Sequence, residues 1–265
     1  MAAWRDRYGP WAVVTGASAG IGKSFARQLA ERGLDLILVA RREPLLEALA
    51  KELSARHGVA VRPLVADLSD ARGLDRLVAD TASVEVGLLV NNAGAPAFHG
   101  HFVQRQRAEV EALVDFNTRV QAVLAHHFLQ PMARRRRGGL IQVASVTGHV
   151  SMPFMVEYSA SKAYQLAMGE ALYSEMRHWG VDCLVLAPGA TVSERIHFGM
   201  PAEAVVRCAL AALGHQPSVI PGLANRLRMF RLRQLRLRRG MVRACGAFQY
   251  RQLRTRPWQV DGKGQ

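Results

Sequence analysis

A tyrosine and a lysine in the second half of the chain are spaced for proton transfer. Tyr158 and Lys162 are four residues apart in a predicted helix, so their side chains share one face. A phenol titrates near ~10 and is a weak base at neutral pH, but a nearby ammonium lowers that pKa by stabilising the phenolate. Ser145 follows an apolar run and offers a hydroxyl that can hold a substrate oxygen. Many Tyr–Lys pairs lie on ordinary solvated helix faces, and the serine upstream favours the chemical interpretation.

A glycine-rich turn near the N-terminus has the features of a phosphate site. The segment Thr15-Gly16-Ala17-Ser18-Ala19-Gly20-Ile21-Gly22 follows an apolar run and opens a helical pattern. Glycines let the backbone approach a phosphate closely, and a helix N-terminus supplies free N–H groups and a positive dipole end. A packing turn is the alternative, and the strand–turn–helix setting favours the phosphate.

The motifs between Trp11 and Thr191 follow the order found in one enzyme family, and the chain resembles the short-chain dehydrogenase/reductase family. The glycine turn is followed by Asp67-Leu68, Asn91-Asn92-Ala93-Gly94, Asn117, Ser145, Tyr158-Ser-Ala-Ser-Lys162, Pro188-Gly189 and Thr191. This resemblance implies an oxidoreductase that interconverts a ketone or aldehyde and an alcohol with a nicotinamide cofactor. A nucleotide-binding or regulatory protein without catalysis is the alternative, and the intact Ser145, Tyr158 and Lys162 argue against it.

The resemblance also implies roles for individual residues. Tyr158 exchanges a proton with the substrate oxygen, Lys162 holds the nicotinamide ribose, and Asn117 positions a water in a proton relay. Asn117 can instead be a plain polar residue on a helix surface. The catalytic set is therefore Asn117, Ser145, Tyr158 and Lys162, and the cofactor-binding set is Gly16, Ser18, Ala19, Gly20, Ile21, Arg41, Asp67, Leu68, Asn91, Ala93, Tyr158, Lys162, Pro188, Gly189 and Thr191.

The end of the second predicted strand favours NADP(H) as the cofactor. An enzyme that prefers NAD places an acid there to hold the ribose 2′-hydroxyl. This chain reads Leu38-Val39-Ala40-Arg41-Arg42, with two guanidiniums and no acid. Arginine pairs bidentately with phosphate, so the 2′-phosphate is the expected ligand. We expect Arg41 to make this contact and Glu43 to point into the first turn of the next helix. Ordinary surface arginines are the alternative, and of the two Arg42 fits the role of a bystander better.

Short apolar runs alternate with amphipathic stretches along the chain. The predicted strands are Trp11–Thr15, Leu36–Ala40, Val61–Ala66, Val86–Asn91, Leu140–Ala144 and Cys183–Ala187, and the predicted helices are Ile21–Arg32, Pro44–His57, Ser69–Thr81, Gln106–Met132 and Ser159–Trp179. A further helix is expected near Pro201 and an edge strand near Ser218. The pattern predicts an α/β fold: a single-domain, Rossmann-type, doubly wound parallel sheet of about seven strands with helices on both faces.

Composition narrows the class of protein. The 265 residues suit one domain, and three widely spaced cysteines suit free thiols in a reducing compartment. We read Cys183 as a core thiol. No signal peptide, membrane span or metal-ligand spacing is evident, and His99-Gly-His101 is read as a loop without a metal. The expectation is a cytoplasmic enzyme that forms a homodimer or homotetramer through its long helices, as the resemblance implies.

The substrate is expected to be a small apolar ketone or alcohol. The residues expected near the nicotinamide are largely apolar: Phe98, His99, Val146, His149, Met152, Phe154 and Met155. Ordinary core packing is the alternative for the Phe and Met residues. Only about a dozen residues separate Pro188-Gly189 from the helix near Pro201, which predicts a small lid and an open pocket.

The positive charge is concentrated at the C-terminus. The net charge is +14, and the segment from Gly222 to Gln265 contributes +11 of it through eleven arginines, Lys263 and Asp261. We divide the chain into a catalytic domain (1–222) and a basic amphipathic extension (223–265). As a helix, the extension places Leu223, Leu227, Phe230 and Leu237 on one side, widened by Met229 and Leu232. Docking on the body or on a second subunit ranks first, an anionic membrane surface second, and nucleic acid is unlikely because no base-stacking array is present.

Overall fold

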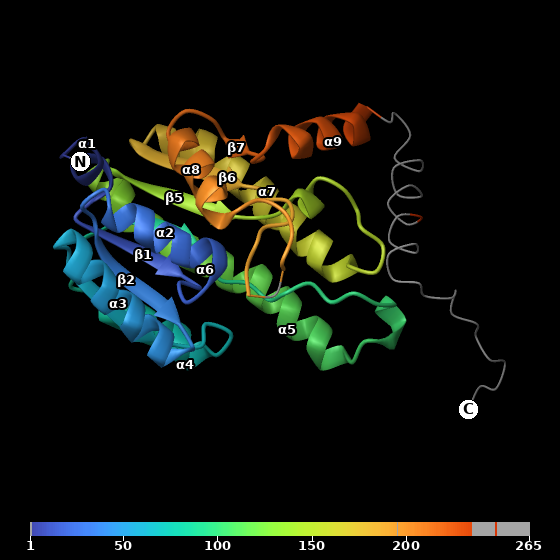
Figure 1. Ribbon diagram of the computed structural model, residues 1–265, viewed down its shortest axis with the longest axis horizontal. Coiled ribbons are helices and arrows are strands. Elements are labelled where there is room, and N and C mark those ends of the chain that lie inside the picture. The colour runs from blue at the N-terminus through green and yellow to red at the C-terminus, as the bar shows by residue number, and fades with distance from the viewer. Residues whose placement is uncertain (1, 195, 235–246, 248–265) are drawn as a thin grey trace.

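The computed structural model describes residues 2–194, 196–234 and 247 of the chain. Its centre is a seven-stranded parallel sheet in the order β3-β2-β1-β4-β5-β6-β7 (Figure 1). The strands are β1 (Trp11–Thr15), β2 (Asp35–Ala40), β3 (Val61–Val65), β4 (Val86–Asn91), β5 (Gly138–Val143), β6 (Val181–Leu186) and β7 (Ser218–Val219). The predicted α/β fold, its seven strands and the strand at the sheet edge are confirmed.

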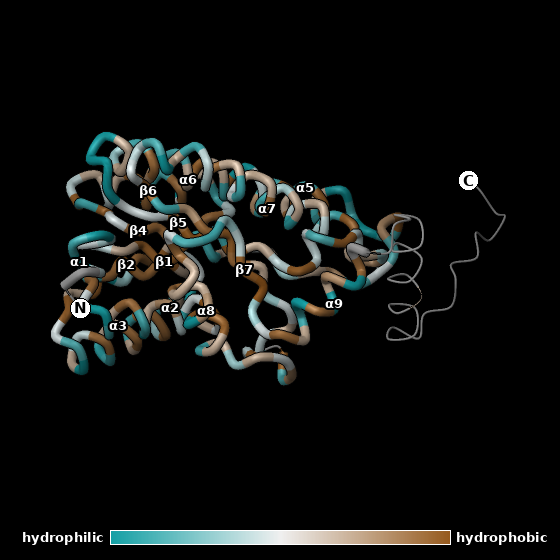
Figure 2. The backbone as a smooth tube through the Cα atoms, turned by 90° about the horizontal axis from the view of Figure 1, so that it is seen from above, coloured by the Kyte–Doolittle hydropathy of each residue, from teal (hydrophilic) through white to brown (hydrophobic). Residues whose placement is uncertain are grey.

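Helices cover both faces of this sheet, which gives three layers (Figure 2). One layer holds α2 (Gly20–Ala30), α3 (Glu43–His57) and α8 (Ala202–Ala212); the other holds α4 (Ala71–Thr81), α6 (Arg119–Arg135) and α7 (Val156–Arg177). The helix α5 (Arg107–Asn117) lies beside α7. The remaining elements are α1 (Ala2–Tyr8), η1 (Phe102–Gln104), η2 (Val146–Gly148) and α9 (Leu223–Gln234).

Each central strand supplies side chains to both cores. In β1, Ala12 and Val14 pack in the core with Phe25 of α2, while Val13 packs in the core with Phe128 of α6. Strands β4 and β5 are buried along their whole length. Because helices cover both faces, these strands need apolar side chains at successive positions, which explains their continuous apolar runs. Cys183 lies in the second core, and burial raises its pKa to about 12, as expected of a core thiol.

The single helix predicted over Gln106–Met132 is wrong in one respect, because the structure divides it into α5 and α6 at Thr118. There the backbone has φ −120° and ψ −72°, outside the helical region. The carbonyl oxygen of Asn117 accepts a hydrogen bond from Gln165 Nε2 at 2.8 Å, and the side chain of Asn117 folds against Ala95. These contacts with other segments take the place of regular helical continuation.

The first part of the predicted basic extension forms α9 and packs on the body. Met229 is buried against Val150, and Asn225 donates to the carbonyl oxygen of Pro221 at 2.9 Å. The predicted apolar side faces outward instead, with Leu223 and Phe230 exposed. The rest of the extension lies outside the described residues. Within the described part of the chain, no helix is both long and apolar enough to cross a membrane.

Candidate active site

The loop between β1 and α2 requires glycine at two points. Gly16 has a φ of +67°, in the left-handed region, and a Cβ there would lie 2.8 Å from Nδ2 of Asn92. At Gly22 a Cβ would come within 2.2 Å of the carbonyl oxygen of Gly16. No side chain caps α2 at Ala19, which leaves the N–H groups of its first turn for an anionic ligand. The loop therefore has the geometry predicted for a phosphate cradle.

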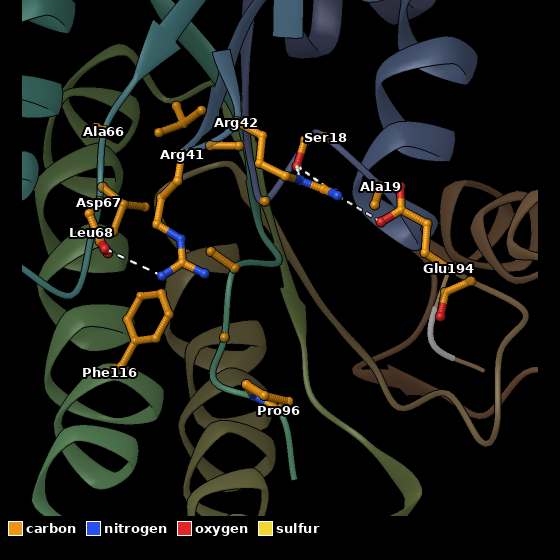
Figure 3. Close-up of a pocket in the computed structure, with 17 residues that line it drawn as sticks. Ser18, Ala19, Arg41, Arg42, Ala66, Asp67, Leu68, Pro96, Phe116 and Glu194 are labelled. Atoms are coloured by element: carbon orange, nitrogen blue, oxygen red, sulfur yellow. Dashed lines mark hydrogen bonds and ion pairs between the residues drawn. The ribbon is translucent and has the colours of Figure 1, made fainter. Parts of the chain in front are cut away.

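A cavity of about 450 Å³ opens in front of this turn, at the carboxyl ends of the strands (Figure 3). The predicted residues that line it are Gly16, Ser18, Ala19, Gly20, Arg41, Asp67, Leu68 and Ala93. It is also lined by residues that the sequence analysis did not assign: Arg42, Phe116, Ser193 and Glu194. Parallel strands gather their C-terminal loops at one sheet edge, which is why segments so distant in the sequence meet here.

Both arginines after β2 line this cavity. Arg41 Nη1 lies 3.4 Å from Asp67 Oδ2, and the Arg41 side chain remains 71% exposed. Arg42 donates to Glu194 Oε2 at 2.7 Å and to Ser18 Oγ at 3.1 Å (Figure 3). Arg42, expected to be the bystander of the two, lines the same cavity as Arg41, because as N-cap of α3 it lies next to the glycine turn. Glu43 begins α3, as expected.

Asp67 carries a negative charge beside these guanidiniums. Partial burial opposes ionisation of its carboxyl group, but hydrogen bonds from the Ser69 hydroxyl and N–H and the charge of Arg41 outweigh it, so its pKa is lowered. The Arg41–Asp67 contact is long for an ion pair and largely exposed, so it holds Arg41 weakly. Arg41 is thus free to exchange this partner for a phosphate.

Ser145, Tyr158 and Lys162 meet in an adjoining cavity of about 280 Å³. Its wall also contains the predicted Ile21, Pro188, Gly189 and Thr191. Burial raises the pKa of Tyr158, and a hydrogen bond with Ser145 opposes that rise. Lys162 Nζ lies 5.6 Å from the centroid of the Tyr158 ring. The protonated phenol, the serine hydroxyl and the lysine therefore converge on one small space.

Lys162 is held by a buried network that reaches Asn117. Its ammonium donates to the carbonyl oxygen of Val143 at 3.1 Å and to Gln165 Oε1 at 2.9 Å. Gln165 in turn donates to the main-chain carbonyl of Asn117, and Asn117 Nδ2 donates to Ser161 Oγ. Burial lowers the pKa of Lys162 to about 8. Asn117 is fully buried in this network, so the structure does not place it on a helix surface.

Gln165 was missed by the sequence analysis, although a local pattern pointed to it. It is three residues after Lys162, which puts both side chains on the same face of α7. Asn92 was also missed as a site residue: it lines the cavity around Tyr158 and donates to the carbonyl oxygen of Thr15 at 2.8 Å. Its neighbour Asn91, the predicted cofactor residue, lines neither cavity and instead bonds Gln121 and Gln142 inside the fold.

The predicted substrate residues are not among those that line the cavity around Tyr158. Phe154 and Met155 are buried, and His149 and Met152 line a separate hollow beside α7. The apolar wall near Tyr158 comes instead from Ala95, Pro96, Val143, Val192 and Ile196.

His101 packs edge-on against Phe154, with the ring centroids 5.0 Å apart. In the part of the chain that the structure describes, no cluster of three His, Cys, Asp or Glu side chains is placed to hold a metal ion.

Comparison with known proteins identifies the family. The family model described as short chain dehydrogenase matches residues 10–198. The chain belongs to the short-chain dehydrogenase family. This confirms the resemblance seen in the order of the motifs. A 7β-hydroxysteroid dehydrogenase from Clostridium sardiniense is 33% identical over 237 residues, which cover 85% of this chain and 90% of that protein.

Solved structures of other members agree with this assignment. A structure from work on the stereoselectivity of 7β-hydroxysteroid dehydrogenase superimposes with a TM-score of 0.86 at 28% identity, covering 91% of this chain and 98% of the other. A short-chain dehydrogenase from Sphingobium yanoikuyae in complex with NADPH superimposes with a TM-score of 0.75 at 29% identity, covering 96% and 99%. The chain is therefore an oxidoreductase of this family acting on alcohol and ketone groups.

Proposed function

We propose that this short-chain dehydrogenase uses NADP(H) to interconvert a bulky apolar ketone and its secondary alcohol. The observation that carries the proposal is that the cavity lined by Ser145, Tyr158 and Lys162, the inner cavity, adjoins the cavity lined by Arg41 and Arg42, the crevice. A bound nicotinamide would supply the hydride, and Tyr158, assisted by Ser145 and Lys162, would supply the proton.

In the reduction direction, the substrate carbonyl oxygen accepts hydrogen bonds from Ser145 and Tyr158. The Tyr158 hydroxyl transfers its proton to that oxygen as the carbon gains hydride, so the product is a neutral alcohol. The phenolate that remains is stabilised by the Lys162 ammonium. Before the reaction, the raised pKa of the Tyr158 hydroxyl keeps it protonated at neutral pH, so that it can act as the acid. The network through Gln165 and Asn117 holds Lys162 in place for this role.

The cofactor preference rests on the two guanidiniums at the end of β2. The residues fit a 2′-phosphorylated ribose, because Arg41 and Arg42 line the crevice and no acid follows β2 before α3. Arg42 already donates to Ser18 at the glycine turn, so a phosphate there would be bracketed by both arginines and a hydroxyl. The NADPH complex of the similar Sphingobium protein supports this choice.

The substrate class rests on the wall of the inner cavity and on the relatives. Aliphatic side chains, among them Val143, Val192 and Ile196, form part of the wall around Tyr158, and Val192 and Ile196 are partly exposed. Similar proteins include 7β-hydroxysteroid dehydrogenases. A rigid, polycyclic ketone of the steroid type matches such a wall better than a sugar or a charged acid does.

Initial rates with a panel of steroid and smaller ketones, each with NADPH and with NADH, test both proposals. Arg41→Ala and Arg42→Ala should each weaken NADPH by about ten- to a hundredfold while changing NADH little, since a charged hydrogen bond contributes about 1.5–3 kcal/mol. Arg56→Ala, at an exposed arginine of α3 outside the crevice, is the control. Equal losses for the two cofactors would refute phosphate recognition. Tight cofactor binding without turnover of any ketone would favour a regulatory protein.

The described helices expose apolar side chains suited to a homo-oligomer. Val114, Val123, Val156 and Tyr164, on α5, α6 and α7, are all more than one-third exposed. A second copy covering these helices would remove that surface from water. Sedimentation velocity should find a dimer or tetramer, and Tyr164→Asp should weaken it. A wild-type monomer at micromolar concentration would contradict this proposal.

The outward side of α9 suits an anionic membrane surface. Leu223, Leu227 and Phe230 are 69%, 49% and 60% exposed, and the exposed Arg226 and Arg231 flank them. The twelve residues of α9 include no acid. An apolar strip beside arginines can enter the headgroup region, where each arginine adds about 1 kcal/mol.

Vesicle co-sedimentation tests this proposal without removing the helix. The full chain should bind vesicles with phosphatidylserine at low salt, release them at high salt and ignore neutral vesicles. Leu227→Ser with Phe230→Ser should abolish binding, and Leu45→Ser, at a 40% exposed leucine on α3, should not. Failure of the full chain to bind anionic vesicles at low salt would refute the membrane proposal. A changed oligomeric mass in the double variant would assign the strip to a second copy.

A further inference from the structure

A buried ion pair lies directly beside the catalytic tyrosine in the sequence. Arg105 Nη1 donates to Glu157 Oε1, and the two side chains are only 6% and 7% exposed. Glu157 is in the first turn of α7, immediately before Tyr158, and Arg105 ends η1 in the loop that follows β4. Burying a charge is costly, and the attraction of a well-placed opposite charge offsets that cost. Each charge therefore depends on the other to remain in place.

The same two segments are joined at further points. The Gly100 N–H donates to the Phe154 carbonyl oxygen at 3.1 Å, and the His101 ring packs edge-on against Phe154. Phe154 has a φ of +66°, a conformation that a bulky residue adopts only when its surroundings impose it. The Arg105 guanidinium also lies over the Phe98 ring, 4.3 Å from its centroid. Residues 98–105 are thus held against residues 154–157 by a hydrogen bond, a ring contact and the ion pair.

We propose that the Arg105–Glu157 pair is a positioning device that fixes the first turn of α7, and with it Tyr158, to the loop after β4, while keeping the charge beside the phenol balanced. The assignment of Tyr158 as the proton donor rests on the proposed function. Arg105 and Glu157 line neither the crevice nor the inner cavity, so they act through Tyr158 and do not touch substrate.

The balance of charge makes a prediction with a sign. The charged and titratable groups on the elements around the start of α7 include Lys162 on α7, His149 after η2, His99 and His101 in the loop, and Glu109 on α5. Helix α5 also carries Arg107, Glu111 and Asp115, which form ion pairs with Glu111, Arg107 and Arg119. If Arg105 is neutralised, the unpaired Glu157 carboxylate disfavours the Tyr158 phenolate. If Glu157 is neutralised, the unpaired Arg105 guanidinium favours it. Glu109, 3.5 Å from Arg105 but half-exposed, offsets only part of that charge.

The test compares Arg105→Gln, Glu157→Gln and the double variant. The pH midpoint of alcohol oxidation should move up by roughly 0.5–1 pH unit in Arg105→Gln and down by somewhat less in Glu157→Gln. The double variant restores neutrality, so its midpoint should return to the wild-type value while kcat stays reduced. Arg107→Gln and Glu111→Gln, at an exposed ion pair on α5, should change neither quantity. Shifts of the same sign, or none, would overturn the proposal.

Variants that keep both charges, and a direct titration of the Tyr158 phenol, test the positioning role and the charge effect separately. Arg105→Lys and Glu157→Asp retain the charges but change the length of the side chains, so kcat should fall while the pH midpoint of alcohol oxidation stays unchanged. If kcat is unchanged in both variants, the positioning role is refuted, and this result does not depend on whether the glutamine variants fold. The phenol can also be titrated without turnover, from the ultraviolet difference between each variant and the same variant carrying Tyr158→Phe. Opposite phenol shifts in a protein that turns over no ketone would support the pair and refute the proposed function.

Discussion

The buried ammonium of Lys162 makes the stability of the cofactor-free protein depend on alkaline pH. Burial lowers its pKa from 10.5 to about 8, so between these values the unfolded chain binds the proton that the folded chain has lost. The free energy of unfolding must then rise with pH across this interval. Each unit of difference between the two pKa values corresponds to 1.36 kcal/mol, so the free energy of unfolding should rise by about 3 kcal/mol across the interval.

Replacing the lysine by methionine removes this dependence. Lys162→Met deletes the ammonium but leaves the Val143 carbonyl and Gln165 Oε1 without their donor, at a cost of about 1–3 kcal/mol that does not vary with pH. Below pH 8 this cost is offset by removal of the buried charge, so the variant should be about as stable as the wild type or slightly more stable. Above pH 10.5 the wild type should be the more stable protein.

Urea unfolding of both proteins at intervals from about pH 7 to pH 11 measures the difference. Subtracting one unfolding free energy from the other at each pH cancels the contribution of groups that both proteins share. Cys183 is one of these groups: burial raises its pKa to about 12, so its contribution to stability falls as the pH rises. Lys51→Met, at an exposed lysine of α3, is the matched control and should run parallel to the wild type. Parallel curves for Lys162→Met and the wild type would refute the assignment of a depressed lysine pKa.

Three other substitutions have defined outcomes. Tyr158→Phe should lower kcat by about 10²–10⁴-fold with NADPH affinity, measured by fluorescence titration, nearly unchanged; near-normal turnover would remove Tyr158 from the mechanism. Gln165→Leu should lower kcat by about tenfold through loss of a hydrogen bond to the Lys162 ammonium, with KM little changed; a normal kcat would mean that Val143 alone holds the lysine. Met229→Ser should destabilise the protein by about 2–4 kcal/mol in urea unfolding, and no loss would contradict docking of α9.

Much of the site follows from rules that act over a few residues. Gly16 and Gly22 are required by backbone geometry within one turn, and Tyr158 and Lys162 share a helix face whatever surrounds them. The apolar strands follow from coverage on both faces, so the fold class and the number of strands were predictable from the pattern, whereas the strand order came from the structure. The side on which the basic segment docks could not be predicted, because a helix with apolar residues on two sides can pack through either side. In the structure Met229 packs against Val150, so that side faces the body.

What the amino-acid sequence determined by itself is the sheet, the glycine turn proposed to bind phosphate and the identity of the side chains proposed for catalysis. Only the tertiary structure decided how these are held: Gln165 reaches the carbonyl of Asn117, Arg42 reaches Glu194, and Arg105 reaches Glu157. Those partners are 48, 152 and 52 residues apart in the chain. Propensity and periodicity report on neighbours within a turn or a strand, whereas contacts at such separations depend on how whole elements pack. The residues proposed to position Tyr158 and Lys162 are therefore placed by packing between elements.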